Sequence, residues 1–256
     1  MEMKPLFEHY RSSRPVYAPD LPGFGASERG DRPYSPEFFA ETLLAFIDAV
    51  LEEPPDVVAL SLGAEFAARA LVRAPDKAAS LALISPTGLG SRRTPSGRAS
   101  DRLERAFRLP GTGALFLALT SRPSIRHFLN MAFEGAAPRE MIDYAHATAR
   151  QPGAKYAPFR FLSFRLFTPG ALEELYLKVP HPTLVLYDRD PNVSFERLDD
   201  LLQRRANCRA LRIAPTRGLP HWERLDETAR ALDEFWNGLH EKQASPSHMP
   251  SNETSA

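Results

Sequence analysis

The sequence has only one cysteine, Cys208, among its 256 residues. An internal disulfide framework is therefore excluded, and such sparing use of cysteine is typical of proteins from reducing compartments. We expect the protein to be cytoplasmic. The sequence also lacks metal-ligand spacing, a phosphate-binding loop and a dinucleotide fingerprint, so we expect chemistry without a metal or a cofactor.

Net charge and long apolar runs are lacking as well. Lys plus Arg and Asp plus Glu number 32 each, so no net field favours nucleic acid or an anionic membrane as a partner. The N-terminus, residues 1–10, has no apolar run that could serve as a signal peptide or an anchor. The apolar patch around Leu115 is far shorter than the roughly 20 residues that cross a bilayer. We expect a small-molecule substrate and no membrane span, and the oligomeric state stays open.

Glycine is scarce beside proline, at 14 against 24 residues, which indicates many firmly terminated segments. Hydrophobic residues make up 43% and charged residues 25% of the chain. This is the composition of a globular protein with one substantial core. We expect one domain with an inserted subdomain.

Short apolar runs alternate with helical periodicity in two parts of the chain. Buried strands are expected at 57–60 and 81–84, further strands at 183–187 and 210–213, and a shorter strand at 16–18. Helices are expected after the Ser35-Pro36 N-cap, between the strand at 57–60 and Pro75, around 195–205 and at 226–239. This alternation predicts an α/β fold with a doubly wound, mostly parallel sheet.

The alternation stops between Gly88 and Leu177, where helical pieces are expected at 115–119, 125–133 and 141–149. We interpret 88–177 as a helical cap inserted between two parts of the core, 1–87 and 178–240. Residues 241–256 have too little apolar content to pack and are expected to form a disordered tail. A solvated cap face is the favoured interpretation of an arginine-rich stretch, and a site for an acidic partner is the alternative. The stretch contains Arg92, Arg93, Arg98, Arg102, Arg105 and Arg108.

One serine lies in a turn between a buried strand and a helix, in Ala59-Leu60-Ser61-Leu62-Gly63. Such a turn can hold a serine in a strained conformation, with its Oγ above the sheet edge, and it needs small neighbours. Gly63 meets that need and Ala59 meets it in part. The alternative is that Ser61 is only the N-cap of the helix.

Three segments together resemble the α/β-hydrolase family. They are Asp20-Leu21-Pro22-Gly23-Phe24-Gly25-Ala26-Ser27, the serine turn, and Gly218-Leu219-Pro220-His221-Trp222-Glu223. In that family a serine, an acid and a histidine follow one another along the chain. The resemblance implies that Ser61 is the nucleophile and that His221 is the general base, since imidazole titrates near neutrality.

The family's acid follows the strand before the penultimate helix, where Asp188 and Asp190 compete. We favour Asp190, because the family often has Asp-Pro after a short turn, and we interpret Asp188 and Arg189 as solvated turn residues. The acid would orient His221. The alternative is a turn aspartate whose side chain merely caps local amides.

The resemblance also implies an oxyanion hole that combines the backbone amide of Leu62 with an amide from an earlier loop, where the family usually has His-Gly. The residues before Asp20 contain neither a His-Gly pair nor an apolar strand ahead of one. We therefore expect the family's first strands and oxyanion loop to be absent. The family's serine turn is usually Gly-x-Ser-x-Gly, and Ala59 departs from it.

These residues predict a cofactor-independent serine hydrolase that cleaves a small, apolar carboxylic ester through an acyl-enzyme. Amide and carbon-carbon bonds stay open. The alternative is a non-catalytic or truncated relative that binds a small ligand or a partner. The substrate-binding residues are unknown, although six phenylalanines of the cap would suit an apolar group or equally the cap's own core. They are Phe128, Phe133, Phe159, Phe161, Phe164 and Phe167.

Overall fold

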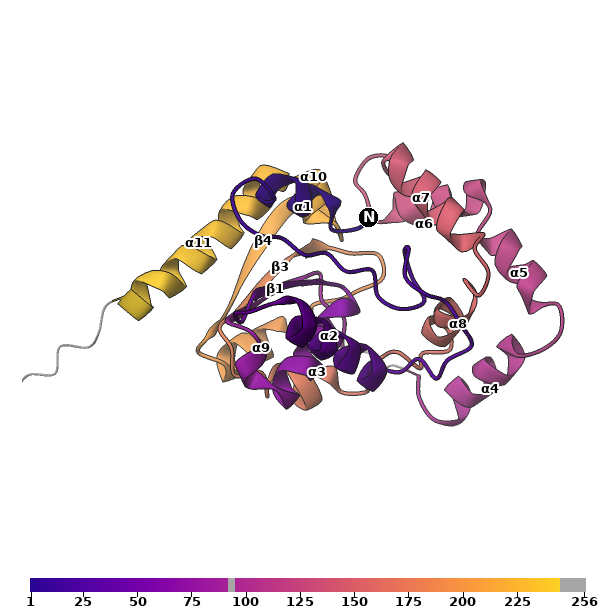
Figure 1. Cartoon of the computed structure of the whole chain (residues 1–256), viewed down its shortest axis with the longest axis horizontal. Coiled ribbons are helices and arrows are strands. Elements are labelled where there is room, and N and C mark those ends of the chain that lie inside the picture. Colours follow the sequence, from indigo (N-terminus) through magenta and orange to yellow (C-terminus); the bar gives the residue numbers. More distant parts are fainter. Residues whose placement is uncertain (92–94, 245–256) are drawn as a thin grey trace, which may run out of the picture.

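A computed structural model of the chain describes residues 1–91 and 95–244. Its sheet has four parallel strands in the order β1-β2-β3-β4 (Figure 1). The strands are β1 (Asp56–Leu60), β2 (Ser80–Ile84), β3 (Thr183–Arg189) and β4 (Cys208–Arg217). The four longer predicted strands are confirmed, and each extends by at least one residue beyond its apolar run.

Helices connect and cover these strands. Before β3 they are α1 (Lys4–Tyr10), α2 (Pro36–Val50), α3 (Gly63–Arg73), η1 (Pro75–Lys77), α4 (Arg98–Phe107), α5 (Thr112–Leu119), α6 (Arg122–Met131), α7 (Arg139–Ala149), α8 (Tyr156–Leu162) and the π-helical turn η2 (Leu172–Tyr176). After β3 they are α9 (Leu198–Arg204), α10 (Pro220–Glu223) and α11 (Leu225–Ala244). Helix α2 begins as predicted, because Ser35 Oγ accepts a hydrogen bond from the Phe38 amide at 3.1 Å.

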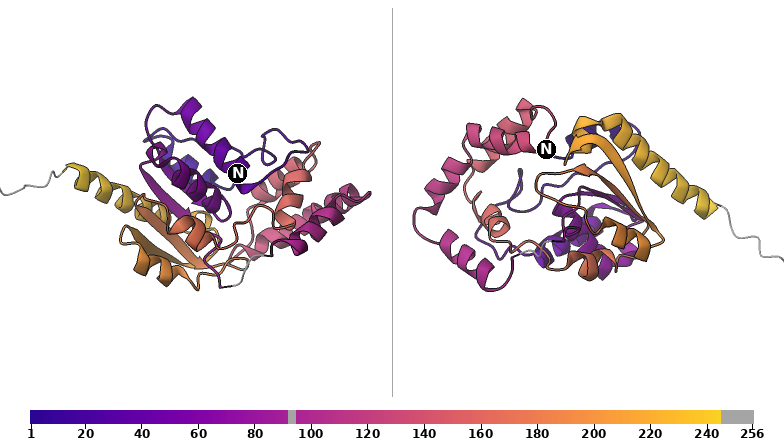
Figure 2. Two further views of the ribbon diagram at one scale, coloured as in Figure 1. Left: turned by 90° about the horizontal axis from the view of Figure 1, so that it is seen from below. Right: turned by 180° about the vertical axis from the view of Figure 1, so that it is seen from behind.

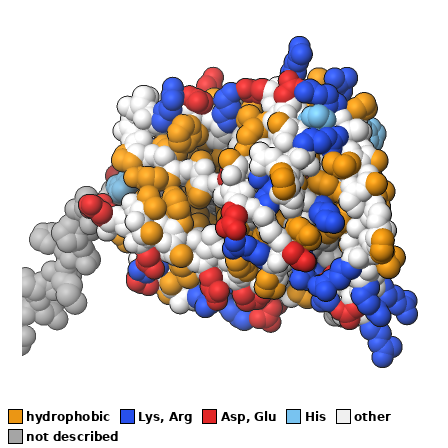
Figure 3. Space-filling model, turned by 45° about the vertical axis from the view of Figure 1, so that its right-hand side comes forward, with side chains coloured by type: hydrophobic (Ala, Val, Ile, Leu, Met, Phe, Trp, Pro, Cys, Tyr) orange, Lys and Arg blue, Asp and Glu red, His pale blue; other side chains and the backbone are white. Residues whose placement is uncertain are grey.

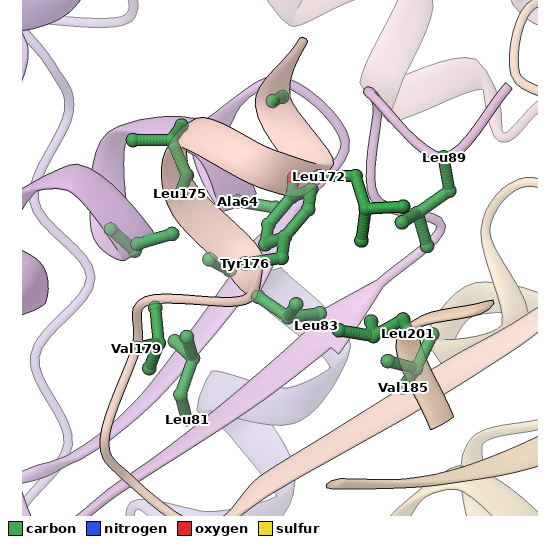
Figure 4. Close-up of a cluster of buried hydrophobic side chains, with 14 of the residues drawn as sticks. Ala64, Leu81, Leu83, Leu89, Leu172, Leu175, Tyr176, Val179, Val185 and Leu201 are labelled. Carbon is green, nitrogen blue, oxygen red and sulfur yellow. The ribbon is translucent and has the colours of Figure 1, made fainter. Parts of the chain in front are cut away.

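The two faces of the sheet bury separate hydrophobic cores. Leu81 and Leu83 of β2 pack with α3, η2 and α9 in one core (Figure 4), whereas Ala82 and Ile84 pack with α1 and α11 in the other. Side chains of a strand point alternately to opposite faces, so a strand that is covered on both sides is apolar throughout. The predicted α/β class with helices on both faces of a parallel sheet is therefore confirmed.

Residues 16–18 do not form the short strand that was predicted. The chain from Pro15 to Asp20 has no regular secondary structure, and none of the described strands pairs with it. A strand requires a hydrogen-bonded neighbour as well as apolar side chains. The prediction was wrong because the sequence of a segment does not show whether another strand lies beside it.

The loop that follows is a tight turn built around Asp20. Its Oδ2 accepts a hydrogen bond from the Ala26 amide at 2.7 Å. Gly25 has a φ of 54°, and a Cβ atom there would lie 2.0 Å from the carboxyl carbon of Asp20. Only glycine fits this position, which explains the second glycine of the Asp20–Ser27 motif.

Every described element between β2 and β3 is helical, and we refer to α4 through η2 as the helical segment. In Figures 1 and 2, α4, α5, α6 and α7 form an arc beside the sheet, and α8 lies between the arc and the sheet. The pieces predicted at 115–119, 125–133 and 141–149 correspond to α5, α6 and α7. None of the helices in residues 1–91 and 95–244 has the length and apolar character needed to cross a membrane.

Two of the sequence predictions fall partly on residues that the structure does not describe. Arg92 and Arg93 of the arginine-rich stretch lie outside the described residues, as do residues 245–256 of the predicted tail. Helix α11 continues to Ala244, beyond the expected boundary at 240.

Candidate active site

Ser61 lies in the turn between β1 and α3 and has a φ of 50°, which is rare for a serine and marks backbone strain. Its amide donates to the carbonyl of Ile84 at 2.9 Å, and its carbonyl accepts from the Ala64 amide at 3.1 Å. Helix α3 has Leu62 as its N-cap and no capping hydrogen bond from a side chain. The alternative interpretation of Ser61 as the helix N-cap is therefore wrong.

The small residues around this turn differ in their packing. Ala59 is buried in the same core as Ala64 and Ala68 of the following helix, so its small size suits its surroundings. Gly63 has no positive φ, and a Cβ atom there would meet nothing within 4 Å. The expected crowding at Gly63 is therefore not found among the described residues.

His221 lies in α10, after β4 and before α11, and its side chain is fully buried. Its Nε2 is 2.9 Å from the carbonyl oxygen of Glu2, which also accepts a hydrogen bond from Trp222 Nε1 at 2.7 Å. Because a carbonyl can only accept, Nε2 bears the proton in this arrangement. Burial lowers the pKa of His221 to about 4, so the imidazole is neutral at pH 7.

The other ring nitrogen of His221, Nδ1, is buried and has no hydrogen-bond partner among the described residues. A buried polar atom without a partner is costly, and a catalytic role is one explanation for such an atom. The general base of a catalytic triad uses this nitrogen to contact the acid.

Asp188 is a buried residue of β3 and not the solvated turn residue that was expected. Its two carboxylate oxygens accept hydrogen bonds from Arg212 Nε at 2.6 Å and from the Thr216 amide at 2.7 Å. Burial alone would raise the pKa of Asp188, but these bonds outweigh it and the pKa is lowered. Asp188 therefore ties β3 to β4. The neighbouring Arg189 is exposed, as expected, but pairs with Glu134 at 2.8 Å.

Asp190 follows β3 and is half-buried. Its Oδ1 accepts from the amides of Asn192 at 2.7 Å and Val193 at 3.0 Å, so it does cap the local amides as the alternative interpretation supposed. Its Oδ2 lies over Gly218, where a Cβ atom would be 2.7 Å away. Burial raises the pKa of Asp190, although the two amide hydrogen bonds oppose the shift.

The fold brings the three predicted residues to one edge of the sheet. Ser61 follows β1, Asp190 follows β3 and His221 follows β4, and parallel strands place their carboxyl ends together. Leu60, beside the serine, packs in the same apolar cluster as Leu219. No hydrogen bond joins the three side chains to one another in the described part of the chain.

The predicted oxyanion donor, the backbone amide of Leu62, lies at the start of α3. It donates to no acceptor among residues 1–91 and 95–244. A helix N-terminus favours negative charge, because its first amides have no partner within the helix. The position of this amide, directly after the serine, suits a developing oxyanion.

Sequence reasoning missed Glu65, which is 1% exposed and four residues after Ser61. Its carboxylate accepts hydrogen bonds from the Thr87 hydroxyl and from the Thr168 amide, the latter at 2.7 Å. Burial raises the pKa of Glu65 against the effect of these bonds. Glu65 thus ties α3, directly after the serine turn, to the chain between α8 and η2. A glutamate on the otherwise apolar buried face of α3 was the available signal.

The phenylalanines of the helical segment do not gather in one place. Phe133 lies near Trp222, with 6.5 Å between ring centroids, whereas Phe159 stacks on Phe107 at 4.6 Å in a separate cluster. Phe128 and Phe161 are exposed. A cavity of about 480 Å³ lies between α4, α5 and α8, and no triad candidate lines it.

Neither a metal site nor a reactive cysteine accompanies the three candidates in the described part of the chain. Within the described residues, no group of three or more His, Cys, Asp or Glu side chains could hold a metal ion. Cys208 is the first residue of β4 and therefore lies at the amino-terminal ends of the strands, away from the three candidates. Burial raises the pKa of its thiol to about 11, so the thiol is protonated at pH 7.

Replacement of Gly218 by alanine is expected to destabilise the protein by at least about 2 kcal/mol. Gly218 has a φ of 98°, and an added methyl group would collide with the Asp190 carboxylate. Urea unfolding would measure the change. Gly135→Ala is the matched control, because a Cβ atom there meets open space and the φ is not positive. Equal stability of the two variants would contradict the contact with Asp190.

The sequence matches the family model of the alpha/beta hydrolase family over residues 2–231, which is most of the chain. The protein belongs to this family. A comparison with curated protein sequences finds no match.

Solved structures share this fold at low sequence identity. A meta-cleavage product hydrolase from Pseudomonas fluorescens IP01 has a TM-score of 0.72 and 17% identity, and the match covers 93% of this chain and 85% of that one. A thermophilic esterase from Thermogutta terrifontis has a TM-score of 0.69 and 20% identity with the same coverage. An N-formylmaleamic acid deformylase from Pseudomonas putida S16 has a TM-score of 0.64 and 16% identity, covering 90% and 86%. The family and these neighbours support a hydrolase.

Proposed function

We propose that the protein is a serine hydrolase that cleaves a small, apolar ester through an acyl-enzyme. Ser61 Oγ attacks the carbonyl carbon, His221 takes the serine proton and gives it to the leaving group, and water then releases the acyl group. The observation that carries this proposal is the φ of 50° at Ser61, in a strand-turn-helix at the carboxyl edge of a parallel sheet. Such strain in a non-glycine residue concentrates at functional sites.

Asp190 is the acid in this proposal. Both oxygens of Asp188 are occupied by Arg212 and Thr216, whereas Oδ2 of Asp190 accepts no hydrogen bond within the described chain. Asp190 lies over Gly218, and Gly218 is three residues before His221 in the chain. The Nδ1 atom of His221 has no hydrogen-bond partner among the described residues. A bond from Nδ1 to Oδ2 would satisfy both atoms and place the Nε2 lone pair toward the serine.

The contact between His221 and Glu2 must break before catalysis. A general base needs a lone pair on Nε2, but Nε2 donates its proton to the carbonyl of Glu2 here. We therefore propose that residues 1–3 move away from His221 when the substrate binds, and that the proton then lies on Nδ1 toward Asp190. The amide of Leu62 would stabilise the oxyanion.

The helical segment acts as the cap over this site. It is joined to the core by hydrogen bonds from the Tyr144 hydroxyl to Asp20 at 3.0 Å and from the Glu134 amide to Glu223 of α10 at 2.6 Å. An apolar cluster between the cap and the core includes Phe133 and Met141 from the cap and Leu219 from the core. Such surroundings favour an apolar acyl group. We retain the cytoplasm as the proposed location, because the sequence has one cysteine.

A second candidate is a non-catalytic relative that binds a small ligand at this edge. The observation that favours it is the engagement of His221 Nε2 by Glu2, which holds the imidazole in the form that cannot accept the serine proton. The two candidates differ in whether Ser61 is activated.

Fluorophosphonate labelling of the purified chain tests the proposal. Mass spectrometry should locate a single adduct on Ser61, and p-nitrophenyl esters of increasing acyl length should be hydrolysed. A folded sample that forms no adduct but binds such esters would be the non-catalytic relative.

Two aspartate variants are expected to separate the acid from its neighbour. Asp190→Asn should lower kcat by about ten-thousand-fold, since an amide cannot hold the correct tautomer of the histidine. Asp188→Asn should instead lower the free energy of unfolding by about 1–3 kcal/mol, because it weakens the buried bonds to Arg212 and Thr216. Steady-state kinetics and urea unfolding of both variants give the comparison. The opposite result would make Asp188 the acid.

A further inference from the structure

Helix α5 lies at the surface although almost all of its side chains are apolar. Leu115, Leu117 and Leu119 are 49%, 48% and 41% exposed. Phe116 is the buried residue of this helix and packs against Phe159. Monomeric soluble proteins rarely present several large apolar side chains together unless another surface covers them.

The apolar surface continues on both sides of this helix. Leu109, before α5, is 60% exposed, and Phe128 of α6 is 53% exposed. Figure 1 shows α4 and α5 on the side of the arc that is farthest from the sheet. We refer to the exposed apolar residues of 109–128 and the arginines of α4 and α6 as the α5 face.

The α5 face is also locally cationic. Residues 98–126 include six arginines and only two acidic residues, although the whole chain has no net charge. Glu104 pairs with Arg160 at 2.6 Å and with Arg108 at 2.9 Å, Asp101 pairs with Arg165, and Arg122 pairs with Asp143. Arg102 and Arg126 form no ion pair within the described chain. Figure 3 shows basic side chains beside apolar ones on this side of the molecule.

We propose that the α5 face binds an anionic lipid surface. Leucines of α5 would enter the boundary between headgroups and acyl chains, and the flanking arginines would contact the acidic headgroups. A second copy of this chain fits less well, because a symmetric contact would bring two cationic faces together. Nucleic acid would leave the leucines uncovered.

Vesicle flotation of the full chain tests this proposal. We expect the protein to bind phosphatidylcholine vesicles that contain phosphatidylglycerol. Binding to vesicles of phosphatidylcholine alone should be at least about tenfold weaker, because the contacts of about two arginines with acidic headgroups are lost. High salt should weaken the binding. Arg102→Gln and Arg126→Gln should each weaken it about fivefold.

The leucine variant Leu115→Gln/Leu119→Gln should also weaken vesicle binding about tenfold or more, because the apolar insertion is lost. Both leucines are exposed, so urea unfolding should show a fold as stable as the unchanged protein. Matched controls are Leu211→Gln on β4, where the leucine is 44% exposed, and Arg230→Gln, an exposed arginine of α11; both should bind as the unchanged protein does.

Three results would overturn the proposal. They are no binding to the acidic vesicles, equal losses in the control variants, and a dimer that the Leu115→Gln/Leu119→Gln change dissociates without any vesicle binding. The last result would assign the face to a second copy. Ser61 labelling is independent of all three, so failure here leaves the proposed activity untouched.

Discussion

Replacement of Ser61 by alanine is expected to lower kcat for p-nitrophenyl acetate by about 10⁴ to 10⁶-fold, as loss of a nucleophile does in enzymes that act through a triad. Fluorophosphonate labelling should disappear with it. The free energy of unfolding should change by less than about 0.5 kcal/mol, because the variant keeps the backbone and loses only a partly exposed hydroxyl.

Ser61→Gly adds a second readout to the same position. Glycine adopts a φ of 50° without strain, so this variant should be more stable than the unchanged protein by about 1 kcal/mol while remaining inactive. A gain in stability with a loss of activity would show that the strain serves the reaction.

Ser85→Ala is the matched control for the nucleophile. Ser85 follows β2 at the same sheet edge and has a φ of 43°, but it is 1% exposed. Its substitution should keep labelling at Ser61 and leave kcat within a few-fold. Activity that survives in Ser61→Ala, or disappears equally in both variants, would refute Ser61 as the nucleophile.

Acidification is expected to destabilise the protein by about 3 kcal/mol through His221 alone. Its pKa falls from 6.5 to about 4 on burial. Between these two pH values the histidine is protonated in the unfolded chain and neutral in the folded chain. Stability from this group is complete above pH 6.5, declines as the pH falls, and is lost below about pH 4. Urea unfolding at a series of pH values between 7.5 and 4 measures the decline.

The contribution of His221 is separated from that of other groups by substitution. His221→Gln should remove this part of the pH dependence, whereas His240→Gln, at an exposed position in α11, should not. Burial raises the pKa of Asp190 and Glu65, so these two groups make the stability fall as the pH rises, which is opposite to the effect of His221. Their contribution is the same in both variants. Identical slopes in the two variants would mean that His221 is not buried in its neutral form.

The sequence alone determined the strands of the sheet and the order of the candidate site residues. Strands β2 and β3 were recognisable because they are buried on both faces, which requires nearly unbroken apolar runs. The N-cap Ser35 was recognisable because capping depends on neighbours in the chain. The Asp20–Ser27 motif, the serine turn and the segment around His221 predicted the family, which the family model confirms.

Only the tertiary structure decided which of these residues contact one another. Asp188 and Asp190 have similar local sequence, but Arg212 and Thr216, more than twenty residues away in the chain, occupy Asp188 alone. The low pKa of His221 and the burial of Glu65 likewise come from distant segments. Residues 16–18 lack a strand for the same physical reason: hydrogen-bond partners and burial are properties of neighbours in space, which a local sequence pattern does not contain.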